Sequence, residues 1–356
     1  MNFASDNWAG ASDKVIAAIS AANAGAAPAY GTDPLTARVR DRLVDLFERE
    51  LEVFLVPTGT GANALALAAL APSWGGAVIC HEGAHVHADE GGASEFYSAV
   101  KFVPVAGIGG KITPAGLKQA IETYPRHHPN VHQVAATVLS LTNLTECGTA
   151  YTADEMTQLC LQAQEAGLRV HLDGARFANA VAHLQAAPSA LTWRAGVDIL
   201  TFGATKNGCL MAEALVVFDR NLAEAVARLR MRAGHLVSKQ RFIAAQYDAW
   251  LADEHWLDLA EHANAMAARL AAGIRASGAA RLAFEPDGNE VFAVLPRTSA
   301  ARLEQAGARF YEWGADSVAA DRRPGEDETL IRLVCAFATT TREVDRFLSV
   351  LVGKAD

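Results

Sequence analysis

The chain has 356 residues, enough for two domains with substantial cores, and its 51% hydrophobic and 20% charged content is that of an ordinary globular protein. Its apolar runs are all shorter than the roughly 18 residues needed to cross a membrane, and a formal charge of −9 without a Lys/Arg cluster argues against nucleic-acid binding. The five scattered cysteines form no CxxC motif and the N-terminus lacks a signal-peptide pattern, so we expect a cytoplasmic protein with free thiols.

A small-residue turn follows the first predicted strand. Helices are predicted over residues 15–24 and 36–50, a strand over 53–56 and a helix over 64–71, with Thr58, Gly59, Thr60 and Gly61 in the turn. Such a turn presents backbone N–H groups, threonine hydroxyls and the positive end of the helix dipole to an anion. It lacks the patterns of a P-loop and of a dinucleotide site. It is therefore either a phosphate site or a tight turn without a ligand.

The next strand, over residues 77–80, leads into a sequence that matches the HExxH pattern of zinc peptidases, His81-Glu82-Gly83-Ala84-His85. In those enzymes the motif lies inside a helix, so that both histidines face the metal. Here it directly follows a strand and contains Gly83, which favours a loop or a helix start. A zinc hydrolase using His81, Glu82 and His85 remains a remote alternative. His85 could instead stack on an aromatic cofactor and later move protons.

Alternating strands and helices over residues 50–220 predict a mostly parallel sheet. The predicted strands end in polar residues, notably at Thr142, Asp173 and Lys206, and ligands bind at the carboxyl ends of strands in such sheets. Alone, Asp173 would be read as a helix cap and Lys206 as a solvated loop residue. Together they suit pyridoxal 5′-phosphate (PLP), which needs an amine for its carbonyl and a carboxylate for its pyridinium nitrogen.

The C-terminal part has a different pattern. Residues 242–277 are predicted to be largely helical, followed by strands over 281–284, 291–295 and 330–337 and helices over 300–307 and 342–352. We expect an N-terminal segment and large domain over residues 1–240 and a smaller α+β domain over 241–356. Arg332 lies inside an apolar strand and needs a carboxylate partner, from either the protein or a ligand.

Taken together, these stretches resemble the threonine aldolase family, PLP enzymes of fold type I, and most closely its branch of low-specificity L-threonine aldolases and phenylserine aldolase. The resemblance covers nearly the whole chain. It is carried by SDN at 5–7, YGTD at 30–33, FLVPTGT at 54–60, His85 with Glu90, HLDGAR at 171–176, FGATKNG at 202–208 and IRLV at 331–334. The chain departs from the usual family sequence at residues 142–145.

The resemblance implies a PLP-dependent retro-aldol cleavage of L-β-hydroxy-α-amino acids, of the threonine, allo-threonine or phenylserine type, to glycine and an aldehyde. A PLP-dependent β-eliminating lyase and an aminotransferase are the alternatives with the same cofactor. It also implies a homotetramer, built as a dimer of dimers, with active sites at the dimer interface. No metal is expected in the active site, and neither a membrane nor a nucleic acid is expected as a partner.

Roles for individual residues follow from the same resemblance. Lys206 would bind PLP covalently, Asp173 would pair with the pyridinium nitrogen and Arg176 would contact the ring hydroxyl. The phosphate would be bound by Thr58, Gly59 and Thr60, and His85 would stack over the ring. Substrate contacts would come from Ser5 and Arg332 at the carboxylate, His132 near the hydroxyl, Tyr30 reaching the neighbouring subunit's site, and Lys239 in place of a family arginine. His85 and His132 are the candidate bases for the β-hydroxyl proton.

Overall fold

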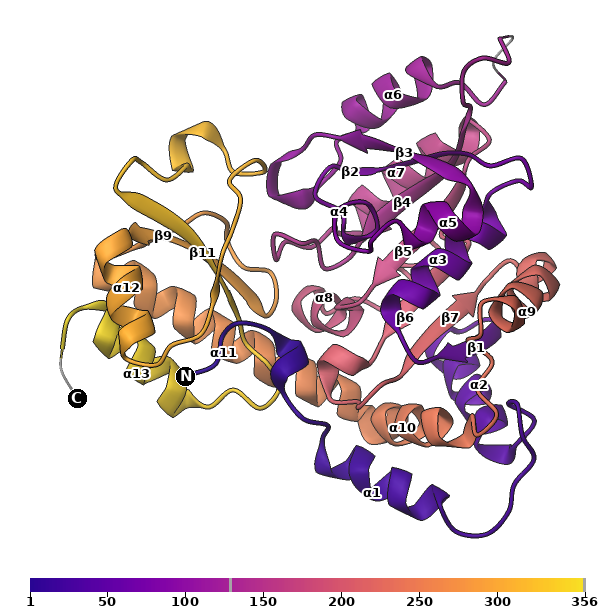
Figure 1. Cartoon of the computed structure of the whole chain (residues 1–356), viewed down its shortest axis with the longest axis horizontal. Coiled ribbons are helices and arrows are strands. Elements are labelled where there is room, and N and C mark those ends of the chain that lie inside the picture. The colour runs from indigo at the N-terminus through magenta and orange to yellow at the C-terminus, as the bar shows by residue number, and fades with distance from the viewer. Residues whose placement is uncertain (128–129, 355–356) are drawn as a thin grey trace.

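The computed structural model describes residues 1–127 and 130–354. Two sheets form the two lobes that Figure 1 shows on either side of the molecule. The seven-stranded sheet consists of β1 (Glu52–Val56), β2 (Gly76–His81), β3 (Val100–Val105), β4 (Ala136–Thr142), β5 (Arg169–Gly174), β6 (Ile199–Gly203) and β7 (Glu213–Val217). The four-stranded sheet consists of β8 (Arg281–Leu282), β9 (Glu290–Pro296), β10 (Tyr311–Glu312) and β11 (Glu328–Val334).

Helices connect and cover these strands. The α-helices are α1 (Asp13–Ala22), α2 (Pro34–Phe47), α3 (Gly59–Leu70), α4 (His85–Ala88), α5 (Ala93–Ser98), α6 (Pro114–Thr123), α7 (Ala153–Glu165), α8 (Phe177–Leu184), α9 (Ala223–Arg232), α10 (Arg241–Leu251), α11 (His255–Ser277), α12 (Arg297–Gln305) and α13 (Thr341–Leu351). Short 3-10 turns are η1 (Asp6–Trp8), η2 (Ile108–Gly110), η3 (Thr205–Asn207), η4 (Arg220–Leu222), η5 (Ala252–Glu254) and η6 (Ala320–Arg322). Within residues 1–127 and 130–354, no helix is long and apolar enough to span a membrane.

The large sheet is mostly parallel, as predicted. Its strand order is β1-β7-β6-β5-β4-β2-β3, and β7 pairs antiparallel with both of its neighbours while the other pairs are parallel. Because β7 reverses direction between β1 and β6, those two strands run the same way. The carboxyl ends of β1, β2, β4, β5 and β6 therefore lie at one edge of the sheet, which is where ligands bind in this class of fold.

Helices bury both faces of this sheet, which explains why its strands are almost continuously apolar. Helix α3 packs on β5, β6 and β7, and α7 packs on β4 and β5. Every residue of β2 and β6 is buried. On one face, Phe202 of β6 contacts the rings of Phe47, Phe177 and Trp250, which come from three different helices.

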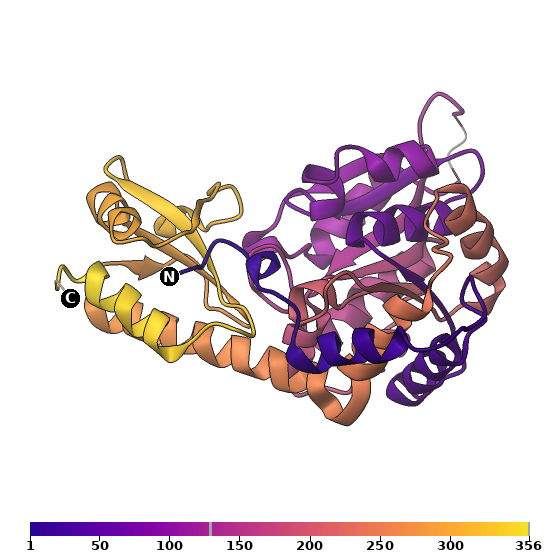
Figure 2. The same cartoon turned by 60° about the horizontal axis from the view of Figure 1, so that its bottom comes forward.

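The smaller lobe is an antiparallel sheet of order β10-β11-β9-β8, covered by α11, α12 and α13. The N-terminus joins this lobe: Phe3 is fully buried in its core, with its ring 5.3 Å from that of Phe347. Helix α11, with 23 residues, runs from the large lobe to the small one (Figure 2). The division at residue 240 stays a prediction. Because Tyr247 and Trp250 of α10 belong to the large core, we propose a boundary within α11.

Two elements begin or end at residues that the sequence pattern did not predict. Helix α3 begins at Gly59, because Thr58 caps it by accepting a hydrogen bond from the Gly61 N–H. The helical stretch over 242–277 is divided by η5, where Asp253 and Glu254 both have a φ of 56°. These are not glycines, so the break has no sequence signal of the usual kind.

Candidate active site

A cavity of about 300 Å³ lies at the carboxyl ends of the large sheet's strands. Its wall combines the turn before α3, the polar ends of β4, β5 and β6, and the start of α4. The residues that line it include Asn7, Thr58, Gly59, Thr60, Asn63, His85, Glu90, Thr142, Glu146, Asp173, Arg176, Thr205, Lys206 and Glu213. All seven predicted cofactor contacts thus lie in one cavity, although their roles there stay predictions.

One end of the cavity is the N-terminus of α3. Gly59 and Thr60 are its first residues, so their backbone N–H groups have no partner within the helix and are available to an anion. The absence of a side chain at Gly61 lets His235 pack against this turn, since a Cβ there would lie 2.1 Å from its Cε1 atom. Glu213 faces the same turn, and burial raises the pKa of its carboxyl group to about 7.

Asp173 is fixed at the end of β5 by two hydrogen bonds. Its Oδ1 accepts from the N–H of Ala175 at 2.9 Å, and its Oδ2 accepts from Nδ2 of Asn63 at 2.9 Å. The side chain is buried, and no cation contacts it within hydrogen-bonding distance in the described part of the chain. A buried carboxylate of this kind suits a protonated ring nitrogen, which would supply the missing positive charge.

A short chain of hydrogen bonds connects Asp173 to His85. Nδ2 of Asn63 also donates to Oε1 of Glu90 at 2.8 Å, and the same oxygen lies 2.9 Å from Nδ1 of His85. The bond to Glu90 raises the pKa of His85 and fixes the orientation of its ring. The site predictions omitted Asn63 and Glu90 as contacts. Asn63 could have been found as the polar residue within an otherwise apolar and glycine-rich helix.

Lys206 lies in the 3-10 turn that follows β6. Two hydrogen bonds hold this turn. Nε1 of Trp250 donates to the Asn207 carbonyl at 2.8 Å, and Nδ2 of Asn207 donates to the Trp256 carbonyl at 2.8 Å. The lysine therefore projects into the cavity from a backbone anchored on α10 and α11, as a covalent cofactor contact requires.

Arg176 and Arg332 are linked through acidic residues between the lobes. Arg176 makes two hydrogen bonds to the carboxylate of Asp6, at 2.8 and 3.0 Å, and its Nη1 lies 3.4 Å from Oε2 of Glu290. Nη1 of Arg332 lies 4.0 Å from Oε1 of the same glutamate, which is fully buried. Arg332 thus stands next to the cavity without lining it, and a protein carboxylate, Glu290, is one of its neighbours.

The Arg332 guanidinium retains unused donors. It stacks 4.3 Å from the ring centroid of Trp313, and Nη2 makes a single long hydrogen bond of 3.4 Å to the Ala4 carbonyl. Its Nε is buried and has no partner among residues 1–127 and 130–354. Ser5 follows Ala4 directly, and its hydroxyl accepts from the Asn7 N–H at 3.1 Å. The arginine is therefore oriented with capacity for a further carboxylate.

None of the five predicted substrate contacts is among the residues that line the cavity: besides Ser5 and Arg332, the residues His132, Tyr30 and Lys239 also lie outside it. His132 precedes β4 and so lies at the amino end of a strand whose carboxyl end forms the site, roughly 20 Å or more along the strand direction. Within one chain, the structure does not bring His132 to the cavity, and its contact with the substrate stays a prediction. Tyr30 and Lys239 are exposed beside each other, since the Tyr30 N–H donates to the Ser238 carbonyl at 2.9 Å.

The HExxH histidines do not form a metal site. His81 ends β2, where its Nε2 lies 3.2 Å from the Gly107 carbonyl oxygen, whereas His85 begins α4 and contacts Glu90. Because the motif is split between a strand and a short helix, its two rings have different partners. The described residues contain no cluster of three or more His, Cys, Asp or Glu arranged to hold a metal.

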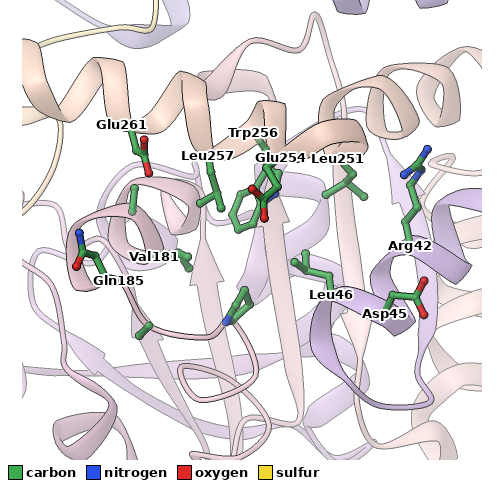
Figure 3. Close-up of a pocket in the computed structure, with 13 residues that line it drawn as sticks. Arg42, Asp45, Leu46, Val181, Gln185, Leu251, Glu254, Trp256, Leu257 and Glu261 are labelled. Atoms are coloured by element: carbon green, nitrogen blue, oxygen red, sulfur yellow. The ribbon is translucent and has the colours of Figure 1, made fainter.

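A larger cavity, of about 540 Å³, lies between α2, α8 and the start of α11 (Figure 3). Leu46, Leu251 and Trp256 give it an apolar wall, and Figure 3 shows Arg42 and Asp45 together at one side of it. Arg42 there is already paired with Asp248 at 2.7 Å. No lysine and no histidine are among the residues that line this cavity, whereas both converge in the smaller one, so we assign the candidate site to the smaller cavity.

Comparisons with known proteins agree with this geometry. The family model of the β-eliminating lyases matches residues 2–297. The chain is 40% identical to the low specificity L-threonine aldolase of Pseudomonas aeruginosa, over 99% of this chain and 98% of that one. It is 41% identical to the corresponding aldolase of a Pseudomonas species, over 87% and 88% of the two chains.

Solved structures give the same result. The threonine aldolase of Leishmania major matches with a TM-score of 0.90 and 28% identity, over 98% of each chain. Serine palmitoyltransferase of Sphingomonas wittichii, at 16% identity and a TM-score of 0.70, shares the fold. The chain therefore belongs to the β-eliminating lyase family and, within it, to the PLP-dependent threonine aldolases of fold type I.

Proposed function

We propose that this protein is a PLP-dependent aldehyde-lyase that cleaves L-threonine and related L-β-hydroxy-α-amino acids to glycine and an aldehyde. The observation that carries the proposal is the convergence of Lys206, Asp173 and the N-terminus of α3 in one cavity. An amine, a buried carboxylate and an anion site are the groups that hold the carbonyl, the ring nitrogen and the phosphate of PLP. The two Pseudomonas relatives are named for this activity.

When bound, PLP supplies a ring that accepts the electron pair left on the substrate's α-carbon. The residues of the chain do the rest. Asp173 would keep the ring nitrogen protonated, Arg176 would contact the ring hydroxyl and Lys206 would hold the cofactor's carbonyl carbon. Thr58, Gly59 and Thr60 would bind the phosphate, and His85, whose orientation is fixed by Glu90, would lie against the ring. Arg332 and Ser5 hold the substrate carboxylate, which sets the orientation of the Cα–Cβ bond.

A product assay tests the proposed function. With L-threonine, L-allo-threonine or L-phenylserine, we expect glycine and the corresponding aldehyde in equal amounts, without loss of activity in a chelator. Release of ammonia and a keto acid would instead indicate a β-eliminating lyase. Transfer of the amino group to an added keto acid would indicate an aminotransferase. Inactivation by the chelator would instead support the alternative of a zinc hydrolase that uses His81, Glu82 and His85.

We further propose that the enzyme is a cytoplasmic homo-oligomer, a tetramer built from dimers with the sites at the dimer interface. Exposed apolar side chains flank the Lys206 turn: Trp8 is 56% exposed, and Leu210 and Met211 are 52% exposed. The Ser12 N–H donates to the Gly208 carbonyl, which joins the segment before α1 to the same turn. The Tyr30 side chain, 56% exposed, extends from a surface loop and is available to a second chain.

Subunit complementation tests this arrangement. Light scattering should give a multiple of the 37.7 kDa chain mass. If Tyr30 acts in the partner's site, Tyr30→Ala and Lys206→Ala should each be inactive alone. Mixing the two variants under conditions of subunit exchange should restore part of the activity, because one site of each hybrid dimer is intact. A monomeric mass, a fully active Tyr30→Ala variant or an inactive mixture would contradict the proposal.

A further inference from the structure

Glu146 is a wall residue of the active-site cavity that the sequence analysis did not single out. It follows β4, and its Oε1 accepts from the His85 N–H at 2.8 Å and from the Thr142 hydroxyl at 3.2 Å. Its Oε2 is buried and has no hydrogen-bond partner in the described part of the chain. One carboxylate oxygen thus positions the residue beside His85, and the other is free for a ligand.

Glu146 also lines a second cavity of about 300 Å³ that adjoins the first. This cavity lies between the loops of the large sheet and the small lobe, with Phe284 and Trp313 in its wall. Trp313 is the ring on which Arg332 stacks. Glu146 is therefore placed where the cofactor cavity meets a space that leads toward the proposed carboxylate contact.

Glu146 lies where the hydroxyl-bearing β-carbon of a bound substrate is expected. If Arg332 holds the carboxylate and the amino group is directed to Lys206, the hydroxyl-bearing β-carbon must take the remaining opening. The boundary between the two cavities is such an opening, and Glu146 contributes an unused acceptor there. His132, one of the two predicted bases, is too far away within the chain to compete for this role.

The protonation behaviour of Glu146 is compatible with a base at neutral pH. Burial raises its pKa to about 7, and the negative charge of Asp173 adds to the rise. Its hydrogen bonds from His85 and Thr142 limit the increase. The ionisable groups around it are the His85 ring and the side chains of Cys80, Cys147, Tyr151, Asp173 and Arg176.

We propose that Glu146 is a catalytic residue that removes the proton of the substrate's β-hydroxyl as the Cα–Cβ bond breaks; this rests on the proposed aldolase function. The O–H electron pair becomes the second C–O bond of the aldehyde, and the Cα–Cβ pair stays with the α-carbon, delocalised into the cofactor ring. The proton passes to the Glu146 carboxylate. An equivalent proton is then added to the α-carbon to give glycine, so hydrogen and charge balance.

The variant Glu146→Gln tests the proton transfer separately from the positioning role. Glutamine keeps the size of the side chain and an amide oxygen for the His85 N–H, but it cannot accept the proton. We expect kcat/KM for L-threonine to fall by roughly 10²- to 10⁴-fold. In the wild type, kcat/KM should fall as pH drops below about 7, because the base becomes protonated. This acidic limb should be absent in the variant.

Exchange of the glycine α-proton with D₂O distinguishes the possible failures. That reaction has no β-hydroxyl, so Glu146→Gln should retain it within about twofold of the wild-type rate. A variant that loses exchange as well, or one that keeps both its kcat/KM and its acidic limb, would overturn the role of Glu146. Absence of exchange in the wild type itself would contradict the proposed function instead.

Two more variants complete the test. Glu122→Gln is the control, because Glu122 is exposed on α6 and lines neither cavity, and its kcat/KM and pH profile should stay unchanged. Glu146→Asp decides the matter if Glu146→Gln does not fold. Since aspartate keeps an ionisable carboxyl group, the acidic limb must persist in that variant, and its loss would overturn the proposal.

Discussion

Replacing Lys206 with alanine is expected to abolish covalent attachment of PLP and to lower kcat for L-threonine by at least about 10³-fold. No other lysine lines the cavity among the described residues, so there is no second amine in place to take over. The turn that carries Lys206 is anchored by Trp250 and Asn207 rather than by the lysine, so the fold should survive the change.

Borohydride reduction of the PLP-loaded protein, followed by peptide mass mapping, is the measurement. The wild type should carry the cofactor on the peptide that contains Lys206, and the variant should carry none. Lys101→Ala is a matched control, since Lys101 is exposed on β3 of the same sheet. Cofactor found on another lysine, or substantial activity in Lys206→Ala, would show that the site has been assigned incorrectly.

Replacing Arg332 with lysine is expected to weaken glycine binding, and to raise KM for L-threonine, by roughly 10²-fold while PLP stays bound. Lysine keeps a positive charge near the buried Glu290 but cannot form the two parallel hydrogen bonds of a guanidinium to a carboxylate. It also loses the planar stacking on Trp313 that orients the group. The charge-preserving change is the sharper test, because alanine would leave Glu290 with less compensation and could destabilise the fold.

Calorimetric titration with glycine measures this effect directly, and the melting temperature checks the fold. Arg297→Lys serves as the control, since Arg297 lies in the same lobe with its side chain 59% exposed. Unchanged glycine affinity in Arg332→Lys would mean that the arginine only neutralises Glu290. In that case the substrate carboxylate must bind elsewhere.

The sheet, and the residues that line the cavity at its edge, could be predicted because their signals are local. An apolar run that ends in Asp173 or Lys206 marks both a buried strand and the polar group at its end. The family resemblance, which rests on short contiguous stretches, assigned the same residues. In a parallel sheet, these ends must come together whatever the details of the connecting helices.

The remaining features depend on how loops return to the sheet. Glu146, Asn63 and Glu90 meet His85 through contacts that no periodicity encodes. His132 illustrates the role of strand direction: it precedes β4 in the sequence, whereas the cavity lies at the carboxyl end of that strand. A motif can place a residue on an element, whereas the direction of the element decides which edge it reaches.

The N-terminal segment has a mechanical consequence for the two lobes. Phe3 is buried with the small sheet, while α1 packs on α10 in the large lobe, so the chain crosses between them near Asp6. The Asp6 carboxylate accepts bonds from Arg176 on one side and from Asn289 on the other, at 3.1 Å. A sliding displacement would break these bonds, whereas a tilt about Asp6 would preserve them. Any relative motion of the two lobes should therefore be a rotation about Asp6, and Ser5 lies next to the centre of that rotation.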